Sequence, residues 1–285
     1  MSTLRILRRR IRSIQNTQQI TKAMEMVAAA KLRKAQARAQ AARPYAVRIT
    51  EMLENLAAAA SELNHPLFQA REVKRTALVV VTADRGLSGA YNANVIRAAE
   101  QRVRAATPGS LSLVILGRKG RDYFRRRKAP VLVVHTPVPA EARIDFARAL
   151  TEDLIARYLA GEVDRVEILF TRFISALRRN VVTEVFLPIG AGKKEGAAAS
   201  GDTIFEPDPE TIFAELLPRY ATARLFAALA DALASQYSAQ MIAMGAARKN
   251  AGELIELLVL QRNRLRQAAI TKELLDIVGG AEALK

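Results

Sequence analysis

The C-terminal part of the chain carries the longest regular pattern of apolar and polar residues. Residues 219–278 contain no proline. Alternate steps of four and three residues along this run meet ten positions, eight of them apolar and two arginine: Tyr237, Met241, Met244, Arg248, Ala251, Ile255, Leu258, Arg262, Leu265 and Ala269. Because a globular helix averages about 11–12 residues, this pattern predicts a coiled-coil helix over residues 208–283. The alternative is a core helix of a large bundle.

The N-terminal part shows a second long helical pattern. Residues 3–43 contain neither proline nor glycine, and apolar residues recur at helical spacing at Leu7, Ile11, Ile14, Ile20, Met24 and Val27. Pro44 can kink this helix, and the pattern then resumes up to Ala60. Each of these two long helices has its apolar residues on one side and needs a partner to cover them. A second such helix at the opposite end of the chain supplies that partner, which favours the coiled coil over the bundle. We therefore predict that residues 1–60 and 208–283 wind around each other in antiparallel orientation.

The middle of the chain has a different pattern of apolar and polar residues. Apolar runs of strand length occupy residues 77–82, 111–116, 131–134 and 166–170, and helical patterns at 92–105, 119–127 and 142–160 separate them. This alternation predicts a parallel sheet with helices on its faces. Residues 181–188 alternate like an edge strand, 190–201 read as a loop, and the Glu-Pro-Asp-Pro at 206–209 precedes the second long helix. The predicted fold is thus α/β: a Rossmann-like open sheet at 74–205 plus the coiled coil.

The composition excludes several kinds of site. The chain has no cysteine, so disulfides and thiolate metal sites are excluded. The only histidines are His65 and His135, too few for a histidine metal cluster. No run approaches the roughly 18 apolar residues that would indicate a membrane span. We therefore expect neither a metal nor another cofactor.

Positive charge is concentrated near the N-terminus. The formal net charge is +16, and residues 1–43 hold eleven Lys and Arg against the single acid Glu25. Such a helix favours an acidic partner: nucleic acid, anionic lipid or an acidic protein surface. Mitochondrial transit peptides are similarly rich in arginine, but the apolar spacing of this segment continues into the rest of the chain and argues against a transit peptide.

The turn after the first predicted strand, residues 83–92, lies where open α/β sheets bind ligands. Its Gly-Leu-Ser-Gly-Ala approaches the nucleophile elbow of hydrolases, with Ser88 as nucleophile and His135 as the only candidate base. The glycine spacing does not fit a dinucleotide site, and the Gly-Lys-Lys at 192–194 lacks the rest of a phosphate loop. The simplest interpretation is that these glycines permit tight turns.

Several motifs resemble one known family. Residues 11–29 (IRSIQNTQQITKAMEMVAA) resemble the N-terminal signature of the gamma subunit of F-type rotary ATP synthases, and residues 266–274 and 277–281 resemble its C-terminal signature. Residues 84–89 and 206–209 match two further landmarks in the same order, so the resemblance covers the whole chain. Some positions depart from the family pattern: Ser88 replaces a cysteine found in many relatives, Gln236 and Gln240 replace an acid and an arginine, and Lys249 replaces an aspartate.

The resemblance implies a non-catalytic rotor subunit that couples ion flow through a membrane ring to ATP synthesis or hydrolysis. It implies as partners the alpha and beta subunits of the hexamer, the epsilon subunit and the ring of c subunits, on the cytoplasmic face of a bacterial plasma membrane. Contacts with the hexamer are expected at Met24, Glu25, Arg266, Gln267, Thr271 and Glu273. Contacts with the ring and the epsilon subunit are expected at Arg43, Tyr45, Ile204, Phe205 and Glu206. The alternatives from the residues themselves are a basic coiled-coil nucleic-acid binder and a hydrolase with Ser88 as nucleophile.

Overall fold

The computed structural model describes residues 2–59, 65–69, 71–190 and 209–282. The chain forms two compact units: the residues up to Ala28 together with those from Gln240 onward, and Ala29–Ala239. The loop predicted at 190–201 and the Glu-Pro-Asp-Pro at 206–209 fall almost wholly outside the described residues.

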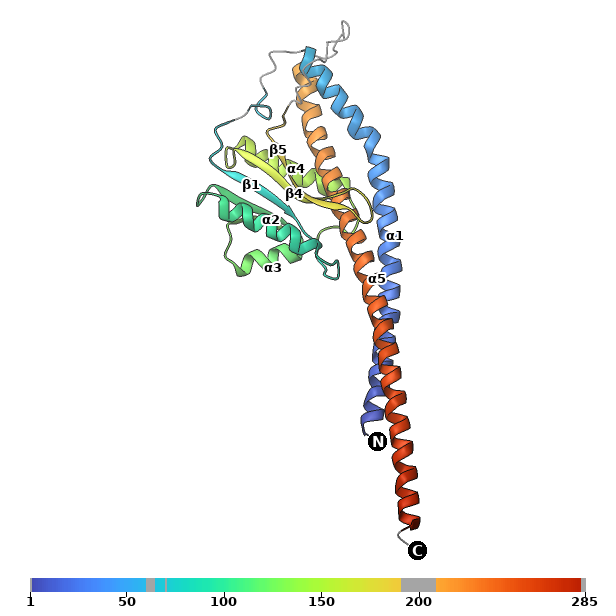
Figure 1. Cartoon of the computed structure of the whole chain (residues 1–285). Coiled ribbons are helices and arrows are strands. Elements are labelled where there is room, and N and C mark those ends of the chain that lie inside the picture. Colours follow the sequence, from blue (N-terminus) through green and yellow to red (C-terminus); the bar gives the residue numbers. More distant parts are fainter. Residues whose placement is uncertain (1, 60–64, 70, 191–208, 283–285) are drawn as a thin grey trace. The chain divides into compact units, whose positions relative to one another are not determined.

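The two ends of the chain form the predicted long helices (Figure 1). Helix α1 spans Ser2–Ala59 and continues through Pro44. Helix α5 spans Pro209–Glu282 and continues through Pro218. Its first residue is a proline, a favourable start because the first backbone N–H of a helix has no intrahelical partner.

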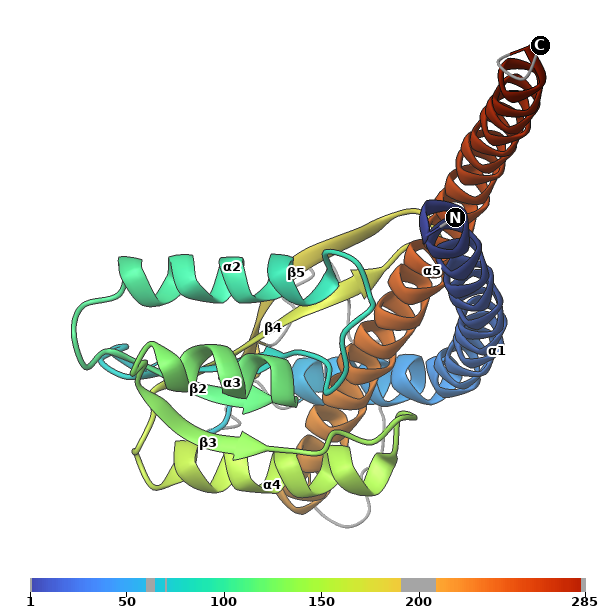
Figure 2. The same ribbon diagram turned by 90° about the horizontal axis from the view of Figure 1, so that it is seen from below.

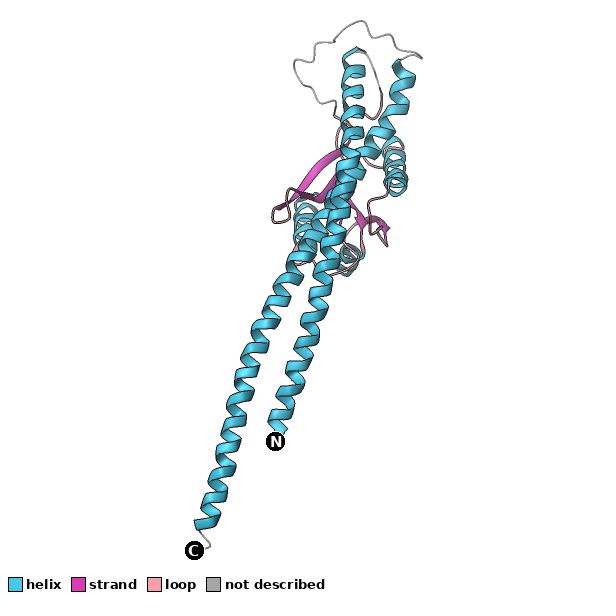
Figure 3. Cartoon of the chain, turned by 90° about the vertical axis from the view of Figure 1, so that its right-hand side faces the viewer, coloured by secondary structure: helices cyan, strands magenta, loops and turns pink. Residues whose placement is uncertain are grey.

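Within the first unit, α1 and α5 form an antiparallel coiled coil. Leu7 and Ile11 of α1 form a buried cluster with Leu258 of α5, whereas Glu25 lies opposite Arg248. Residue numbers therefore rise along one helix as they fall along the other, and both termini lie at the same end of the coil (Figure 3). The predicted antiparallel pairing is confirmed.

The seam of α1 differs in part from the predicted one. The less exposed side chains follow a strict heptad that contains three polar residues: Leu7, Ile11, Ile14, Gln18, Thr21, Glu25 and Ala28. Ile20 and Val27, predicted on the apolar face, are 60% and 55% exposed, so this part of the prediction was wrong. Gln18, Thr21 and Glu25 interrupt the apolar stripe of this seam, so the spacing of apolar residues alone does not predict their positions.

The predicted seam of α5 is confirmed over most of its length. Met244, Ala251 and Leu258 are buried at seven-residue spacing. Ala269, the last predicted position, is exposed. The reason is geometric: α1 begins at Ser2, and Leu7 already packs in the cluster that includes Leu265, so little of α1 remains to cover Ala269.

The second unit contains a five-stranded sheet in the order β3-β2-β1-β4-β5. Its strands are β1 Thr76–Val81, β2 Leu111–Leu116, β3 Val131–His135, β4 Arg165–Phe173 and β5 Arg179–Leu187. The first four are parallel, and β5 pairs antiparallel with β4 at the edge of the sheet. The predicted open parallel sheet and its edge strand are confirmed.

Helices cover both faces of this sheet (Figure 2). Helices α2 (Tyr91–Ala105) and α3 (Arg118–Arg126) pack on one face around Phe124. Helix α4 (Ile144–Leu159) packs on the other face, in a larger core that also contains residues of α5 between 213 and 232 and two side chains of α1. This burial on both faces explains why β1 reads as a continuous apolar run.

The packing of Leu258 generates a prediction about the coil. Leu258→Pro removes one helical hydrogen bond and costs about 3 kcal/mol or more, in a seam where Leu258 is only 6% exposed. We expect soluble protein with reduced helical circular dichroism and a new protease-sensitive site near residue 258, while the sheet of the second unit stays protease-resistant.

The matched control is Glu256→Ala, two residues away on the exposed side of α5. Surface substitutions of this kind usually change stability by less than about 0.5 kcal/mol. Proteolysis patterns of Leu258→Pro and wild type that cannot be distinguished would contradict the assigned seam.

Candidate functional site

The turn between β1 and α2 is bound to its surroundings by its own polar side chains. The carboxylate of Asp84 accepts hydrogen bonds from the backbone N–H groups of Arg118 (2.9 Å) and Val138 (2.7 Å). The side-chain oxygen of Asn92 accepts a hydrogen bond from the N–H of Ala83 (2.9 Å). These bonds tie three loops together at the carboxyl ends of the strands, so the polar residues here have structural partners.

The N-terminus of α3 is closed to anions. Its first amides all have protein partners: the N–H of Arg118 donates to Asp84, that of Lys119 to the carbonyl of Ala83 (3.0 Å), and that of Gly120 to the Thr82 hydroxyl (2.9 Å). Gly117 adopts φ +95°, and a Cβ there would lie 2.2 Å from the carbonyl oxygen of Thr82. The glycine therefore allows close approach of two strand ends, and hydrogen bonds within the chain occupy the amides at this helix N-terminus, which would otherwise attract an anion.

Ser88 and His135 do not form a catalytic pair. The Ser88 hydroxyl is almost fully buried and accepts a hydrogen bond from the Asn92 amide (3.3 Å). The His135 ring packs edge-on against Phe146, its buried Nε2 atom has no hydrogen-bond partner in the part of the chain described, and burial lowers the pKa of the imidazole. A nucleophile needs a base within hydrogen-bond reach, and the geometry supplies none, so the hydrolase hypothesis was wrong.

The middle of the coiled coil is held by a polar contact. The Glu25 carboxylate receives a hydrogen bond from Nε of Arg248 (2.9 Å) and lies above Gly245. A Cβ on Gly245 would lie 3.2 Å from this carboxylate, and a Cβ on Gly252 would lie 3.0 Å from the Gln18 amide. Two polar side chains of α1, seven residues apart, thus sit over two glycines of α5, also seven residues apart.

This arrangement fixes the register of the two helices. A shift by one residue would bring the Glu25 and Gln18 side chains against side chains of α5 instead of glycines. Polar residues at seam positions commonly specify register in coiled coils. Sequence analysis placed Glu25 and Arg248 in separate groups, and the only available signal was the shared seven-residue spacing of the two glycines and the two polar residues.

The residues predicted to contact the hexamer lie at two separate levels of the coil. Met24 and Glu25 are half-buried, level with Arg248. The other four, Arg266, Gln267, Thr271 and Glu273, are exposed on α5. Arg266 lies eighteen residues beyond Arg248, which corresponds to about 27 Å of helix rise. The structure therefore does not bring the six residues into one cluster.

Beyond Leu265, α5 has no cover from other described residues. Every described side chain between 266 and 278 is exposed. Five of these are large and apolar, with exposed fractions of 49–68%: Ile270, Leu274, Leu275, Ile277 and Val278.

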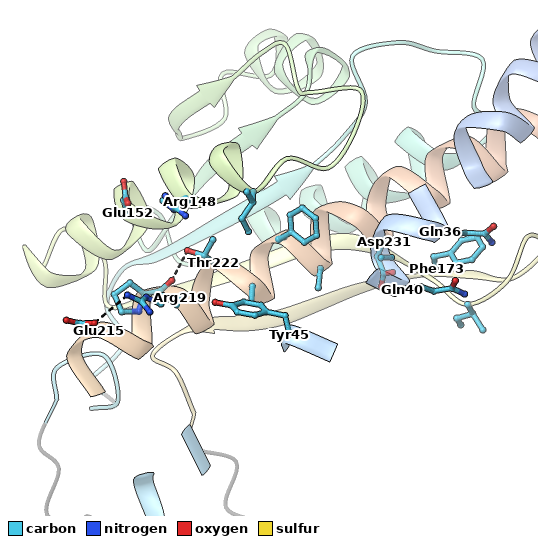
Figure 4. Close-up of a pocket in the computed structure, with 17 residues that line it drawn as sticks. Gln36, Gln40, Tyr45, Arg148, Glu152, Phe173, Glu215, Arg219, Thr222 and Asp231 are labelled. Carbon is cyan, nitrogen blue, oxygen red and sulfur yellow. Dashed lines mark hydrogen bonds and ion pairs between the residues drawn. The ribbon is translucent and has the colours of Figure 1, made fainter. Parts of the chain in front are cut away.

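Of the residues predicted near the membrane ring, only Tyr45 can be placed with its side chain. Tyr45 is 54% exposed and lines a cleft of about 1040 Å³ between α1, α4 and α5 (Figure 4). The cleft also contains Arg148 and Glu152 of α4 and Arg219, which pairs with Glu215 (3.4 Å). The side chain of Arg43 and all of Ile204, Phe205 and Glu206 lie outside the described residues.

The described ranges, residues 2–59, 65–69, 71–190 and 209–282, lack two further kinds of feature. No group of three or more His, Cys, Asp or Glu side chains there has the arrangement of a metal site. No helix in those ranges combines the length and the apolar character needed to cross a membrane.

The amino-acid sequence is similar to known proteins over its whole length. The sequence model of the family described as ATP synthase matches residues 3–284. The ATP synthase gamma chain of Moorella thermoacetica is 48% identical over 285 residues, and that of Heliobacterium modesticaldum is 47% identical over 291 residues; each alignment covers all of both chains.

Solved structures show the same fold. A chain of the Euglena gracilis mitochondrial ATP synthase matches with a TM-score of 0.69 at 18% identity, covering 99% of this chain and 95% of that one. A chain of the Tetrahymena thermophila mitochondrial ATP synthase central stalk and c-ring matches with a TM-score of 0.62 at 22% identity, covering 80% of this chain and 99% of that one. The chain therefore belongs to the ATP synthase gamma-chain family.

Proposed function

We propose that this chain is the central rotor shaft of an F-type ATP synthase. It catalyses no reaction itself and couples ion flow through a membrane ring to ATP synthesis or hydrolysis in the surrounding hexamer of alpha and beta subunits. One observation carries this proposal above all: the coil buries its own seam and still exposes large apolar side chains at its end.

The exposed end of α5 needs a partner. Contiguous exposed apolar side chains on a soluble protein mark interaction sites. The five large apolar residues between 270 and 278 have no cover from the described part of this chain. An apolar collar formed by alpha and beta subunits would bury them while allowing the helix to turn, because contacts that rest on apolar burial are non-directional.

The contact residues divide into two roles in this proposal. Arg266, Gln267, Thr271 and Glu273 lie at the exposed level and are proposed to touch the hexamer directly. Glu25 is already bound to Arg248. We therefore assign Glu25 chiefly to holding the coil in register, with Met24 beside it as the contact at this level.

The contacts with the epsilon subunit and the c-ring are proposed at the other ends of the long helices. Tyr45, with its exposed ring in the cleft between α1, α4 and α5, is the described residue available for such a contact. Arg43, Ile204, Phe205 and Glu206 join it on the strength of the family motif. We propose that the assembled complex lies on the cytoplasmic face of a bacterial plasma membrane.

The direct experiment is purification of the tagged chain from its own cells, followed by native mass measurement. We expect a complex of several hundred kilodaltons that hydrolyses ATP. We also expect Leu275→Glu to reduce recovery of this complex, because a charge would be buried in an apolar collar, where an unpaired charge is strongly unfavourable.

The control for that variant is Leu177→Glu, which introduces the same change at a position that is 82% exposed in the second unit. Recovery should then match wild type. A chain that purifies alone or with nucleic acid would contradict the rotor proposal and favour the basic nucleic-acid binder. Equal losses with the two variants would contradict the assigned collar contact.

The glycine beneath Glu25 generates a second prediction. Glycine in a helix interior is about 1 kcal/mol less favourable than alanine, so Gly245→Ala should stabilise α5. The added Cβ would lie 3.2 Å from the Glu25 carboxylate and would push it away from Arg248. We expect a smaller gain in the free energy of unfolding in wild type than in a Glu25→Ala background, measured by denaturant melting of the helical signal.

The comparison forms a double-mutant cycle, which isolates the interaction between the two positions. Gly252→Ala combined with Glu25→Ala is the matched control, because Gly252 lies beneath Gln18. Effects of Gly245→Ala and Glu25→Ala that simply add would show that the carboxylate does not use the space above Gly245.

A further inference from the structure

Helix α3 and the two residues that follow it form the most basic short segment of the second unit. Residues 118–128 contain seven Lys and Arg against one acid, Asp122. The nearby acids already have partners. Asp122 pairs with Arg121 (2.8 Å), and Glu100 binds Tyr123, Arg104 and Arg127. Five exposed cations have no carboxylate partner among the described residues: Arg118, Lys119, Arg125, Arg126 and Lys128.

Local stability does not account for three of these cations. Arg118 and Lys119 occupy the first two positions of α3, where the helix dipole disfavours positive charge. Lys128 adopts φ +51° just after the helix, a position where glycine is favoured. Its N–H donates to the carbonyl of Arg125 (3.3 Å), and the N–H of Ala129 donates to that of Phe124 (3.2 Å). The backbone there needs left-handed geometry, and the sequence nevertheless keeps a cationic side chain.

Strand β3 lies beside this helix at the edge of the sheet. It pairs with β2 on one side, and no described strand pairs with its other side. Its apolar side chains Val131, Leu132 and Val134 are 36–39% exposed. The strand itself carries no Lys, Glu or Pro of the kind that protects edges from pairing with other chains.

The direction of the free hydrogen-bonding groups follows from the register. The N–H of Gly117 in the β2 end donates to the carbonyl of His135. Backbone groups of successive residues in a strand point alternately to its two sides. The N–H and C=O of Val134 therefore point away from β2, toward the open edge.

The two faces of β3 can also be told apart. Val133 packs with the core that contains α4, and the His135 ring contacts Phe146 of α4. Val131 and Val134 pair with Leu113 and Ile115, which belong to the core that contains α3, so these two valines face the side on which α3 lies. Leu132 lies at an irregularity in the pairing of β3 with β2. An added strand would likewise present every second side chain to the cations of α3.

We propose that α3 and β3 together form a docking surface for an acidic, extended segment of a partner protein, which adds to the sheet as a strand beside β3. Strand addition supplies affinity through the main chain, and side chains at alternate positions supply specificity. Here the specificity is for acidic residues, since Arg125, Arg126 and Lys128 would repel a basic segment. This inference does not depend on the proposed rotor function.

The geometry favours a polypeptide over the other acidic partners. A membrane surface offers no backbone groups to the open edge of β3. Single-stranded nucleic acid is usually held by stacking on aromatic rings. Of the rings on α3, Phe124 is buried, and Tyr123 already packs against Phe124 and Arg127.

The test uses the purified full chain and a fluorescent ten-residue peptide with Glu at alternate positions and Val or Thr between them. We expect saturable binding by fluorescence anisotropy that weakens between about 0.1 M and 0.3 M salt. The same peptide with alternate amides N-methylated keeps its charge and cannot pair as a strand, so it should bind much more weakly. The paired variant Arg125→Gln with Lys128→Gln should weaken binding roughly fivefold, whereas Arg33→Gln with Lys34→Gln removes equal charge elsewhere and should not.

The edge itself is tested by Val134→Pro, which removes the outward N–H, against Val134→Thr, which keeps it. Only the proline variant should lose binding. Equal binding of the methylated and unmethylated peptides would overturn strand addition, and absence of binding would overturn the docking surface. Tighter binding of phosphatidylserine vesicles or of a DNA oligonucleotide, lost in the Arg125→Gln and Lys128→Gln variant, would assign the surface to lipid or nucleic acid and overturn the proposal.

Discussion

The pairing of two helices that cannot be stable alone is the constraint on which this molecule depends. Helices in proteins gain most of their stability from tertiary packing of one face, and α1 and α5 find that packing largely in each other. At one end of the coil, Leu7, Ile11 and Leu258 bury an apolar layer. Further along, the polar side chains of Gln18 and Glu25 lie over Gly252 and Gly245, with Arg248 closing the contact. Apolar layers provide stability, and the polar contacts over glycine define which residues face each other. The exposed residues of the coil surface keep their positions only while this register holds.

The sheet of the second unit shows how a fold that often binds nucleotides can serve another purpose. At the turn after β1, the position of a dinucleotide site, Asp84 and Asn92 are hydrogen-bonded to backbone groups of the chain. At the turn after β2, the amides of Arg118, Lys119 and Gly120 are all bound within the chain. The Asp84 carboxylate bridges two backbone segments. Function therefore cannot be read from such a fold alone. This unit has three surface features available for contacts with partners: the open edge at β3, the basic helix α3 beside it, and the cleft between α1, α4 and α5.

The strong periodic features could be predicted from the sequence, and the polar details could not. Apolar runs located the strands, and the seven-residue spacing of Met244, Ala251 and Leu258 located the seam of α5. The seam of α1 was partly misplaced, since the polar residues Thr21 and Glu25 lie in it, while Ile20 and Val27, predicted on the apolar face, are exposed. Nothing local in the sequence shows that Glu25 meets Arg248 or that a glycine makes room for its carboxylate. Pairings between residues more than 200 positions apart depend on the register of the whole coil. The predicted contact residues remain predictions, and those between 204 and 206 lie outside the described residues.

In the proposed function, this chain turns as a body inside a complex whose catalysis occurs elsewhere. The absence of cysteine allows a direct measurement, because Leu177→Cys would give the chain its only thiol at an 82% exposed position. A bead attached there, on complexes fixed to a surface through the hexamer, would report motion of this chain by microscopy. We expect continuous rotation in one direction when ATP is added, and none without ATP. A bead that stays fixed while the same complexes hydrolyse ATP would contradict the proposed function.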